Sequence, residues 1–297
     1  MVKKSDKVKL SPLVILAFVV LIIYCLCILS PIFWGLLTSV KHIDDFRNNV
    51  LGFPRKEFGF AFENYSFVLE RFHADATYKG QSGEVDLVGM LINTLQYVIG
   101  SALASTIVPC LVAYVVAKFP NKVSNILYTI VLVTMIIPII GSYPSEIVML
   151  RKLNLYNTMH GAWIQKANFL GMYFLVFHAT FVRLSNDFSE AAYLDGAGNF
   201  RVLTNVMFPM ATGVFSTILL LNFITFWNDY QTPLIYMPSY PTLAYGLWYY
   251  CNHSYNEYTS SMPIQLGGCM MLAIPLFVLF IIFQKKLLGR VSLGGLK

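Results

Sequence analysis

Charged side chains are scarce in this sequence of 297 residues, which has 12% charged residues against 57% hydrophobic ones. A soluble domain carries about 25% charged residues, and it needs them to cover its surface. The mean hydropathy of +0.62 agrees with that scarcity. A soluble globular protein, a disordered chain, a secreted disulfide scaffold and a nucleic-acid-binding module are therefore poor fits. The composition predicts an all-α integral membrane protein.

The residue patterns of common catalytic and metal sites are also missing. The sequence contains no Gly-Lys dipeptide, so it has no GxxxxGK[ST] phosphate loop. Its five cysteines form no CxxC pair, and its five histidines form no HxxxH or HExxH pair. No paired carboxylates or nucleophile arrangement occurs inside the apolar segments. We therefore expect a chain that is not an enzyme, with no disulfide framework, no metal site and no cofactor of its own.

What the sequence has instead is long uncharged stretches. A spanning helix needs roughly 20 mostly apolar residues. Six segments meet this requirement, once a few flanking residues are counted in the fourth: 11–39, 87–117, 123–145, 164–183, 202–229 and 259–285. Residues 230–256 are uncharged too, but their prolines and polar side chains predict a loop at the membrane surface. We expect one transmembrane domain over 11–288, with tails at 1–10 and 289–297.

The first apolar segment could be mistaken for a signal peptide, because four lysines precede it. The apolar core of a signal peptide is roughly 7–15 residues long and is followed by small residues for cleavage. Ser11 to Val40 is a longer uncharged run without such a site. We therefore expect it to be retained as the first helix.

The distribution of basic residues predicts which side of the membrane each end occupies. With a cytoplasmic N-terminus, the inner segments hold twelve Lys and Arg residues and the outer segments nine. Basic residues favour the cytoplasmic side, and most of the outer ones lie in one long loop, 41–86, where they weigh less. An arrangement with both termini in the cytoplasm is therefore favoured.

One polar segment, residues 184–201, stands out between the fourth and fifth predicted helices. Asp187 is placed to cap a short helix with Glu190 three residues later, and Gly196 and Gly198 are suited to end it. Asn199 can then cap a helix that enters the membrane. That helix carries Arg201 near its start, and Pro209 is placed to kink it. By itself, this pattern also fits a plain amphipathic connector at the membrane surface.

The same residues resemble the EAA loop of ABC importer permeases, with Glu190, Ala191, Ala192, Gly196 and Pro209 at matching positions. Val206 and Phe208 stand where Ile and Leu are more usual, which is a conservative departure. The longer stretch EAAYLDGAGNFRV is similar to the carbohydrate branch, of the maltose-permease type. The likeness continues through SVKHIDDF, MLINTLQYVIGSALAS and FWNDYQTPL, whereas the tail lacks the usual Gly-Ala-Val-Lys ending.

The resemblance implies a second, six-helix permease of a sugar importer in the bacterial cytoplasmic membrane. Its implied partners are a different permease, two ATPase subunits that bind ATP and Mg, and an extracytoplasmic solute-binding protein. It also implies that the 184–201 loop contacts an ATPase. Ala191 and Ala192 would let its helix sit close in a cleft, with Glu190 and Asp195 at the rim and Arg201 and Pro209 in the helix that follows.

The solute pathway is predicted from polar and aromatic residues near the outer ends of two helices. An ionisable residue inside a membrane is a candidate functional site, and aromatic faces beside amides suit sugars. The candidates are Asn93, Gln96, Trp227, Asn228, Asp229 and Tyr230. An interfacial belt of Trp and Tyr is the alternative for the last four, and bonds between helices are the alternative for the first two.

Two further alternatives stay open at this point. The outer loops 41–86 and 236–258 either contact a solute-binding protein or simply cover the outer face. The chain is either an ABC permease, for an oligosaccharide or a non-sugar solute, or a self-sufficient secondary transporter, for which internal repeats and intramembrane charges are expected.

Overall fold

The computed structural model describes residues 12–78, 81–137, 141–253 and 261–291. The chain is mainly helical and divides into two compact units. The first unit comprises residues 1–71 and 253–271, and the second comprises residues 72–252 and 272–297.

The first unit begins with the most apolar and least buried of the three candidate membrane spans found in the described residues. Its elements are α1 (Pro12–Ser39), α2 (Ile43–Asn48), α3 (Glu63–Arg71) and the first residues of α14 (Met262–Val291). Side chains of α1 are exposed along almost its whole length, and the buried ones lie near its C-terminal end. After α1 the chain turns back, because the Asn64 amide donates to the carbonyl oxygens of Ser39 and Lys41, both at 2.9 Å.

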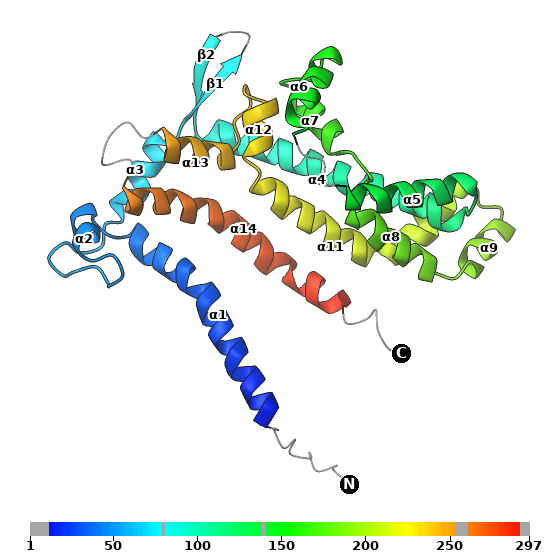
Figure 1. The fold of residues 1–297 in the computed structure, drawn as a ribbon, viewed down its shortest axis with the longest axis horizontal. Helices are drawn as coiled ribbons and strands as arrows, with labels where there is room; N and C mark the ends of the chain where they lie inside the picture. Colours follow the sequence, from blue (N-terminus) through cyan, green and yellow to red (C-terminus); the bar gives the residue numbers. More distant parts are fainter. Residues whose placement is uncertain (1–11, 79–80, 138–140, 254–260, 292–297) are drawn as a thin grey trace. The chain divides into compact units, whose positions relative to one another are not determined.

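The second unit is built around one long helix, α4, against which most other helices pack (Figure 1). It opens with an antiparallel hairpin, in which Ala74 pairs with Val85 and Tyr78 with Gln81. Its elements are β1 (Ala74–Tyr78), β2 (Gln81–Val85), α4 (Leu87–Lys118), α5 (Lys122–Ile136), α6 (Tyr143–Lys152), α7 (Met159–Lys166), α8 (Met172–Arg183), α9 (Asp187–Leu194), α10 (Asn199–Val202), the π-helical turn η1 (Leu203–Met207), α11 (Phe208–Trp227), α12 (Gln231–Tyr236) and α13 (Leu243–Asn252).

The core of this unit lies between α4, α8 and α11 and is rich in phenylalanine. Phe174, Phe177 and Phe181 form one buried face of α8 and pack on Ala113 and Tyr114 of α4. Small residues let the helices approach each other closely. A Cβ at Gly100 would overlap the indole of Trp163, whose Nε1 donates to the carbonyl of Gln96 at 3.1 Å.

Three helices of the described chain are long and apolar enough to cross a membrane: Pro12–Ser39, Leu87–Lys118 and Asn199–Trp227. Three shorter apolar helices accompany them: Lys122–Ile136, Met172–Arg183 and Met262–Val278. The first two long helices lie within a residue of the predicted 11–39 and 87–117. The chain is therefore an apolar, helical protein suited to a membrane.

The middle helices differ from the predicted bounds, because residues that hydropathy ignores interrupt them. The expected helix 123–145 ends at Ile136, and Gly141 has a φ of 79° that an α-helix cannot contain. The expected helix 164–183 is split between α7 and α8, with Gly171 at φ 146° before α8. The expected surface loop 230–256 contains the short helices α12 and α13.

The fifth predicted helix, 202–229, extends from Asn199 to Trp227 and includes a π-helical turn at Leu203–Met207. Pro209 lies two residues after the end of this turn. Because proline lacks an N–H and clashes with the carbonyl four residues before it, a wider turn at this place accommodates the ring. The kink expected at Pro209 therefore takes the form of a π turn. The sixth predicted helix, 259–285, begins at Met262 in α14 and continues to Val291.

Candidate functional site

The coupling segment, residues 184–201, contains a short exposed helix whose C-terminal end is tightly defined. Gly196 has a φ of 80°, the left-handed conformation that glycine adopts without a Cβ clash. The N–H of Ala197 donates to the carbonyl of Ala192, and the N–H of Gly196 donates to that of Tyr193, both at 3.0 Å. These two bonds form a Schellman motif, so Gly196 ends α9 as the sequence pattern indicates.

The start of α9 differs from the expected capping arrangement. Asp187 is the first helical residue, and Asn186 occupies the cap position without a side-chain hydrogen bond to the helix. The Asn186 side chain is engaged elsewhere: Lys118 Nζ donates to its Oδ1 at 2.8 Å and to the carbonyl of Leu184 at 2.6 Å. Likewise, Gly198 rather than Asn199 precedes α10. The C-terminal end of α4 thus holds the entry to α9, a role of Lys118 that sequence patterns did not indicate.

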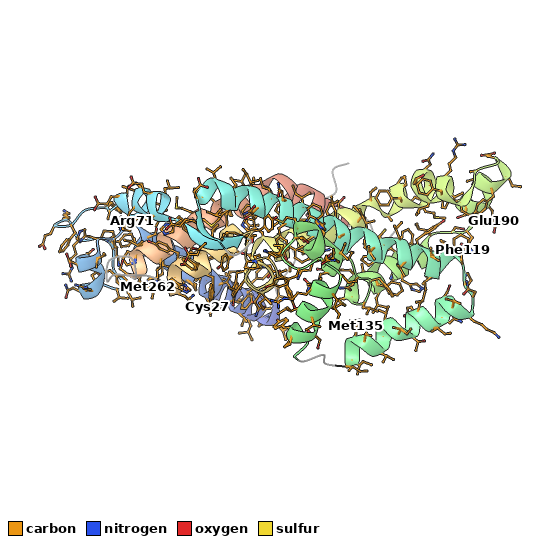
Figure 2. The ribbon with its side chains drawn as sticks, turned by 90° about the horizontal axis from the view of Figure 1, so that it is seen from above. Cys27, Arg71, Phe119, Met135, Glu190 and Met262 are labelled. Carbon is orange, nitrogen blue, oxygen red and sulfur yellow. The ribbon has the colours of Figure 1, made fainter. Side chains whose placement is uncertain are left out.

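The outward side chains of the coupling segment are both apolar and charged. Leu194 is 90% exposed and Phe200 is 78% exposed, and Glu190, Asp195 and Arg201 are exposed as well. Ala191 is also exposed, whereas Ala192 is half-buried and packs against the core. Figure 2 shows Glu190 at the same end of the second unit as Phe119, the residue that ends α4. Such a surface offers both apolar area and charge to a partner protein.

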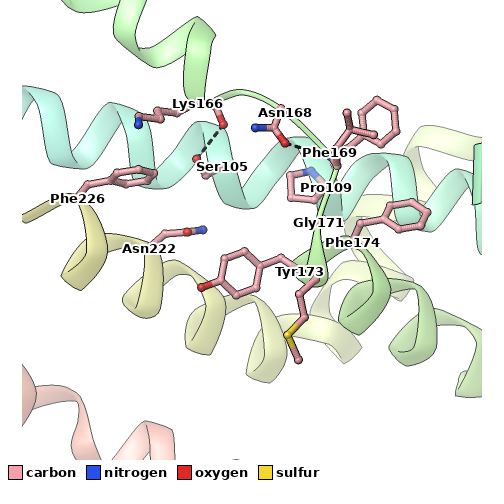
Figure 3. Close-up of a pocket in the computed structure, with 12 residues that line it drawn as sticks. Ser105, Pro109, Lys166, Asn168, Phe169, Gly171, Tyr173, Phe174, Asn222 and Phe226 are labelled. Atoms are coloured by element: carbon pink, nitrogen blue, oxygen red, sulfur yellow. Dashed lines mark hydrogen bonds between the residues drawn. The ribbon is translucent and has the colours of Figure 1, made fainter. Parts of the chain in front are cut away.

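A cavity of about 290 Å³ lies in the second unit between α4, α11 and the segment that joins α7 to α8 (Figure 3). Its polar lining includes Ser105, Lys166, Asn168 and Asn222. Aromatic rings complete it, among them Phe169, Tyr173, Phe174 and Phe226. Amide and hydroxyl groups beside ring faces are the combination that binds a polyhydroxylated solute.

Two hydrogen bonds hold the cavity wall in place. Ser105 Oγ of α4 donates to the carbonyl of Lys166 at 2.8 Å, where α7 ends. Asn222 Nδ2 of α11 donates to Thr106 Oγ1 of α4 at 2.9 Å, and Asn222 is only 4% exposed. The wall is therefore fixed by side chains of α4.

The Asp229 cluster, formed by Tyr97, Lys166, Asp229 and Thr232, lies beside this cavity. Tyr97 donates to Asp229 Oδ2 at 2.7 Å, and the Thr232 hydroxyl donates to the same oxygen at 2.6 Å. Lys166 Nζ stands 3.5 Å from that oxygen and donates to Thr232 Oγ1 at 2.9 Å. Only 25% of the Lys166 side chain and 16% of the Asp229 side chain are exposed. The cluster therefore ties the end of α11 to α4, α7 and α12.

The other predicted pathway residues have separate environments. Asn93 donates to the carbonyl of Pro241 at 3.1 Å, and Gln96 is exposed on α4. Trp227 is buried and stacks on Phe223, whereas Asn228 is exposed and donates to the carbonyl of Ile224. The exposed Tyr230 ring stacks on Trp248 at 6.0 Å and 9°.

None of the six predicted pathway residues is among those that line the cavity. The cavity is instead lined by Lys166, Tyr173 and Asn222, among others, which the sequence did not predict as pathway residues. One signal for Lys166 was available, because it is a charge inside the predicted apolar span 164–183. Nothing local in the sequence indicates that its partner is Asp229, because the two are 63 positions apart in the numbering.

A second polar group ties the short helices α6, α7 and α12 together. Tyr236 and Gln165 both donate to Glu146 Oε2, the latter at 2.9 Å. Hydrogen bonds from the Ser142 hydroxyl, the Tyr236 hydroxyl and the Gln165 amide hold the pKa of the Glu146 carboxyl below its ordinary value, although burial opposes this. The described residues contain no group of three or more His, Cys, Asp or Glu that could hold a metal ion.

The profile of the family described as "binding-protein-dependent transport system inner membrane component" matches residues 105–292. The chain belongs to this family. The match contains α9, the cavity and most of the Asp229 cluster. It confirms the resemblance to ABC importer permeases read from the 184–209 residues, and it makes the chain a transport component of the membrane.

Curated relatives align with the chain over most of their length. The diacetylchitobiose uptake system permease protein NgcG of Streptomyces coelicolor is 24% identical, with 92% of this chain and 86% of the relative covered. The multiple sugar-binding transport system permease protein MsmG of Streptococcus mutans is 26% identical, with 94% and 96% covered. The melibiose/raffinose/stachyose import permease protein MelC of Bacillus subtilis is 25% identical, with 90% and 91% covered.

A solved structure has the same fold. It is a chain of a bacterial ABC transporter involved in the import of the acidic polysaccharide alginate. The TM-score is 0.71 at 24% identity, and the alignment covers 91% of this chain and 95% of that one. The chain therefore has the ABC permease fold.

Proposed function

We propose that this chain is the transmembrane permease subunit of an ATP-driven, binding-protein-dependent carbohydrate importer, with an oligosaccharide as the favoured solute. The observation that carries the proposal is the family match, which contains the whole coupling segment. The sugar assignment is supported by the names of the relatives above, each aligned with at least 90% of this chain.

The proposed topology has six spans, with both termini in the cytoplasm of a bacterial cell. Three long and three shorter apolar helices support this number. A shorter helix reaches across roughly 30 Å of hydrocarbon only with help from the residues that flank it. In this arrangement α9 faces the cytoplasm, while α6, α7, α12 and α13 lie on the opposite side.

The coupling segment is proposed to dock on one of two ATPase subunits that bind ATP and Mg, and a second permease completes the pathway. The contact residues are those of the EAA pattern: Glu190, Ala191, Ala192, Asp195, Gly196, Arg201 and Pro209. The exposed Leu194 and Phe200 add apolar area of the kind that forms the centre of a protein interface. Because Lys118 holds the entry to α9, a displacement of α9 would move α4 and α8 with it.

The cavity between α4, α8 and α11 is proposed to line the solute path. The rings of Tyr173 and Phe226 suit the apolar faces of a pyranose, and the amides of Asn168 and Asn222 suit its hydroxyl groups. The predicted residues Asn93, Gln96, Trp227, Asn228 and Tyr230 stay candidates for its outer entrance. The Asp229 cluster then positions Lys166 at the cavity instead of contacting the solute itself.

The test is to purify the chain from its native host and measure what accompanies it. An ATPase and a second permease are expected to co-purify. ATP hydrolysis by the complex in nanodiscs is expected to rise with the host's solute-binding protein and one sugar from an oligosaccharide panel. Stimulation by a non-sugar solute alone would correct the substrate class. Uptake by the lone chain driven by a proton or sodium gradient would instead identify a secondary transporter.

A further inference from the structure

In the first unit, the chain after α2 folds back along the last turns of α1 (Figure 1). The indole Nε1 of Trp34 donates to the carbonyl of Val50 at 3.0 Å. The rings of Phe33 and Phe53 meet edge to face, with centroids 6.3 Å apart. Phe33 lies six residues before the end of α1 at Ser39, which is about 9 Å along a helix. Residues 49–53 therefore lie beside the helix instead of extending beyond it.

That depth corresponds to the edge of the hydrocarbon layer. The 28 residues of α1 make a helix about 42 Å long, compared with a hydrocarbon core of about 30 Å. If α1 is centred in the bilayer, the last turn or so of the helix passes through the headgroups. Phe33 and Trp34 then stand near the boundary, where tryptophan is enriched in membrane proteins.

Four backbone groups of this irregular segment are hydrogen-bonded to side chains of the same unit. The buried Lys41 donates through Nζ to the carbonyls of Asn49 at 2.6 Å and Val50 at 3.2 Å. The Asn49 amide accepts from Gly52 N at 3.0 Å and donates to the carbonyl of Phe53 at 2.7 Å. Each paired group lowers the cost of placing irregular backbone at the edge of a bilayer.

The outward face of the segment is apolar. Leu51 is 79% exposed, Phe53 67% and Val50 44%, and Phe33 beside them on α1 is 59% exposed. A protein interface of ordinary kind has a polar rim and a hydrogen bond every 100–200 Å² or so. Here three carbonyls and one N–H are already paired internally, and the apolar face continues the exposed surface of α1. These properties suit acyl chains better than a protein partner.

We propose that residues 50–53 insert into the bilayer boundary beside α1, where Val50, Leu51 and Phe53 contact lipid acyl chains. Lys41 is the residue that positions the segment, because it holds two of its carbonyls. The segment fixes the depth of α1 in the membrane. This inference needs only that α1 spans the bilayer and is independent of the solute.

The test uses nitroxide labels on the full chain, purified with the subunits that accompany it. A variant without the native cysteines receives a single cysteine by Leu51→Cys or Phe53→Cys. The complex is placed in nanodiscs of phosphatidylethanolamine and phosphatidylglycerol. Collision of the label with oxygen, which enriches in lipid, is compared with collision with a water-soluble nickel chelate. Ile23→Cys in the middle of α1 is the lipid reference, and Glu57→Cys in the exposed loop is the water reference.

At Leu51 and Phe53, the ratio of oxygen to nickel collision is expected to exceed that at Glu57 roughly fivefold and to approach that at Ile23. High nickel collision would overturn the proposal by placing the segment in water. Low collision with both reagents would overturn it by placing a protein partner on the segment.

Lys41→Met in the Leu51→Cys background tests the positioning role. It is expected to raise nickel collision at residue 51 roughly threefold, because the Asn49 carbonyl loses its side-chain donor and the Val50 carbonyl keeps only Trp34. An unchanged nickel value would remove Lys41 from the proposal.

Discussion

The Asp229 cluster and the coupling segment belong to the same unit, yet they differ in burial. The first buries and pairs its charged groups, whereas the second exposes charged and apolar side chains. In the Asp229 cluster, a carboxylate is largely buried and accepts from Tyr97 and Thr232 beside the Lys166 ammonium. In the coupling segment, Glu190 and Asp195 are exposed, and the Leu194 side chain is 90% exposed.

This difference in burial distinguishes residues that stabilise the fold from residues that are available to bind a partner protein. A buried charge is costly unless it is paired, so the Asp229 cluster is explained by the fold alone. An exposed leucine at the tip of a rigidly terminated helix contributes nothing to folding. The following predictions use this contrast, from the largest expected effect to the smallest.

Removing one partner of the Asp229 cluster should destabilise the chain. Asp229→Ala leaves the Lys166 ammonium without its carboxylate. Lys166→Met leaves the Asp229 carboxylate without its ammonium. We expect each to cost roughly 2–4 kcal/mol, discounted for partial exposure. The apparent melting temperature of the detergent-solubilised complex, followed by size-exclusion chromatography, measures this loss.

The double variant Lys166→Met with Asp229→Leu should recover much of that loss, because no charge stays unpaired. The matched control is Asn228→Ala, because Asn228 is exposed and its amide donates only to its own helix. A double variant no more stable than either single variant would show that the two charges do not depend on each other.

Gly196→Val should uncouple the ATPase while the chain still inserts and assembles. No atom lies within 4 Å of a Cβ built at Gly196, so the effect acts through the φ of 80°. A β-branched residue in this left-handed conformation costs roughly 1–3 kcal/mol, which disfavours the turn that ends α9. We expect a loss of roughly tenfold or more in transport-coupled ATP hydrolysis.

Gly198→Ala is the matched control for that experiment, because Gly198 has a φ of −78° and open space around its Cβ position. It should keep wild-type coupling. Gly196→Asn should be intermediate, since asparagine tolerates the left-handed conformation better than valine does. Wild-type coupling in Gly196→Val would contradict the role assigned to α9.

Leu194→Asp should weaken the retention of the ATPase without destabilising the chain. Burying this side chain at an interface is worth roughly 1.5–3 kcal/mol, so we expect roughly a tenfold loss or more in ATPase retained during purification. The melting temperature of the permease should stay unchanged, in contrast to the Asp229 variants. Thr204→Ala, at an exposed position whose hydroxyl donates to its own helix, is the control. Full ATPase retention in Leu194→Asp would count against docking at this tip.

Acidification should loosen the contact at Glu146, with the smallest effect. The pKa of Glu146 is lowered in the folded chain, chiefly by Ser142 and Tyr236. Its stabilising contribution is therefore complete above the unfolded pKa of about 4.3 and is lost as the pH falls through the lower folded value. The melting temperature of wild type should fall more steeply below about pH 4.3 than that of Glu146→Gln. Parallel curves for the two proteins would remove Glu146 from the acid response.

Local patterns predicted some elements well and others poorly, and the reason differs by element. The helix 11–39 and the helix 87–117 are continuous apolar runs, so hydropathy places their ends within a residue of Pro12–Ser39 and Leu87–Lys118. The helix 123–145 was too long, because hydropathy does not register the extended backbone of Ile137, which ends α5, or the left-handed conformation of Gly141. Gly196 was placed correctly, since a glycine that terminates a helix acts within one turn.

The pathway residues show where sequence reasoning stops. Asp229 was singled out as an ionisable residue in an apolar setting, and the structure gives it Lys166, Tyr97 and Thr232 as partners. The cavity itself was not foreseen, because Asn222, Tyr173 and Ser105 come from three segments that meet only when α4, α8 and α11 pack.

The sequence by itself determined the membrane class, the family and the end of α9, because composition, motif spacing and a single glycine conformation are local properties. Only the tertiary structure decided that Asp229 pairs with Lys166 and that Lys41 holds the chain after α2 against α1. Those pairings depend on which helix faces and loops come together. A buried charged group is stable only when its partner lies beside it.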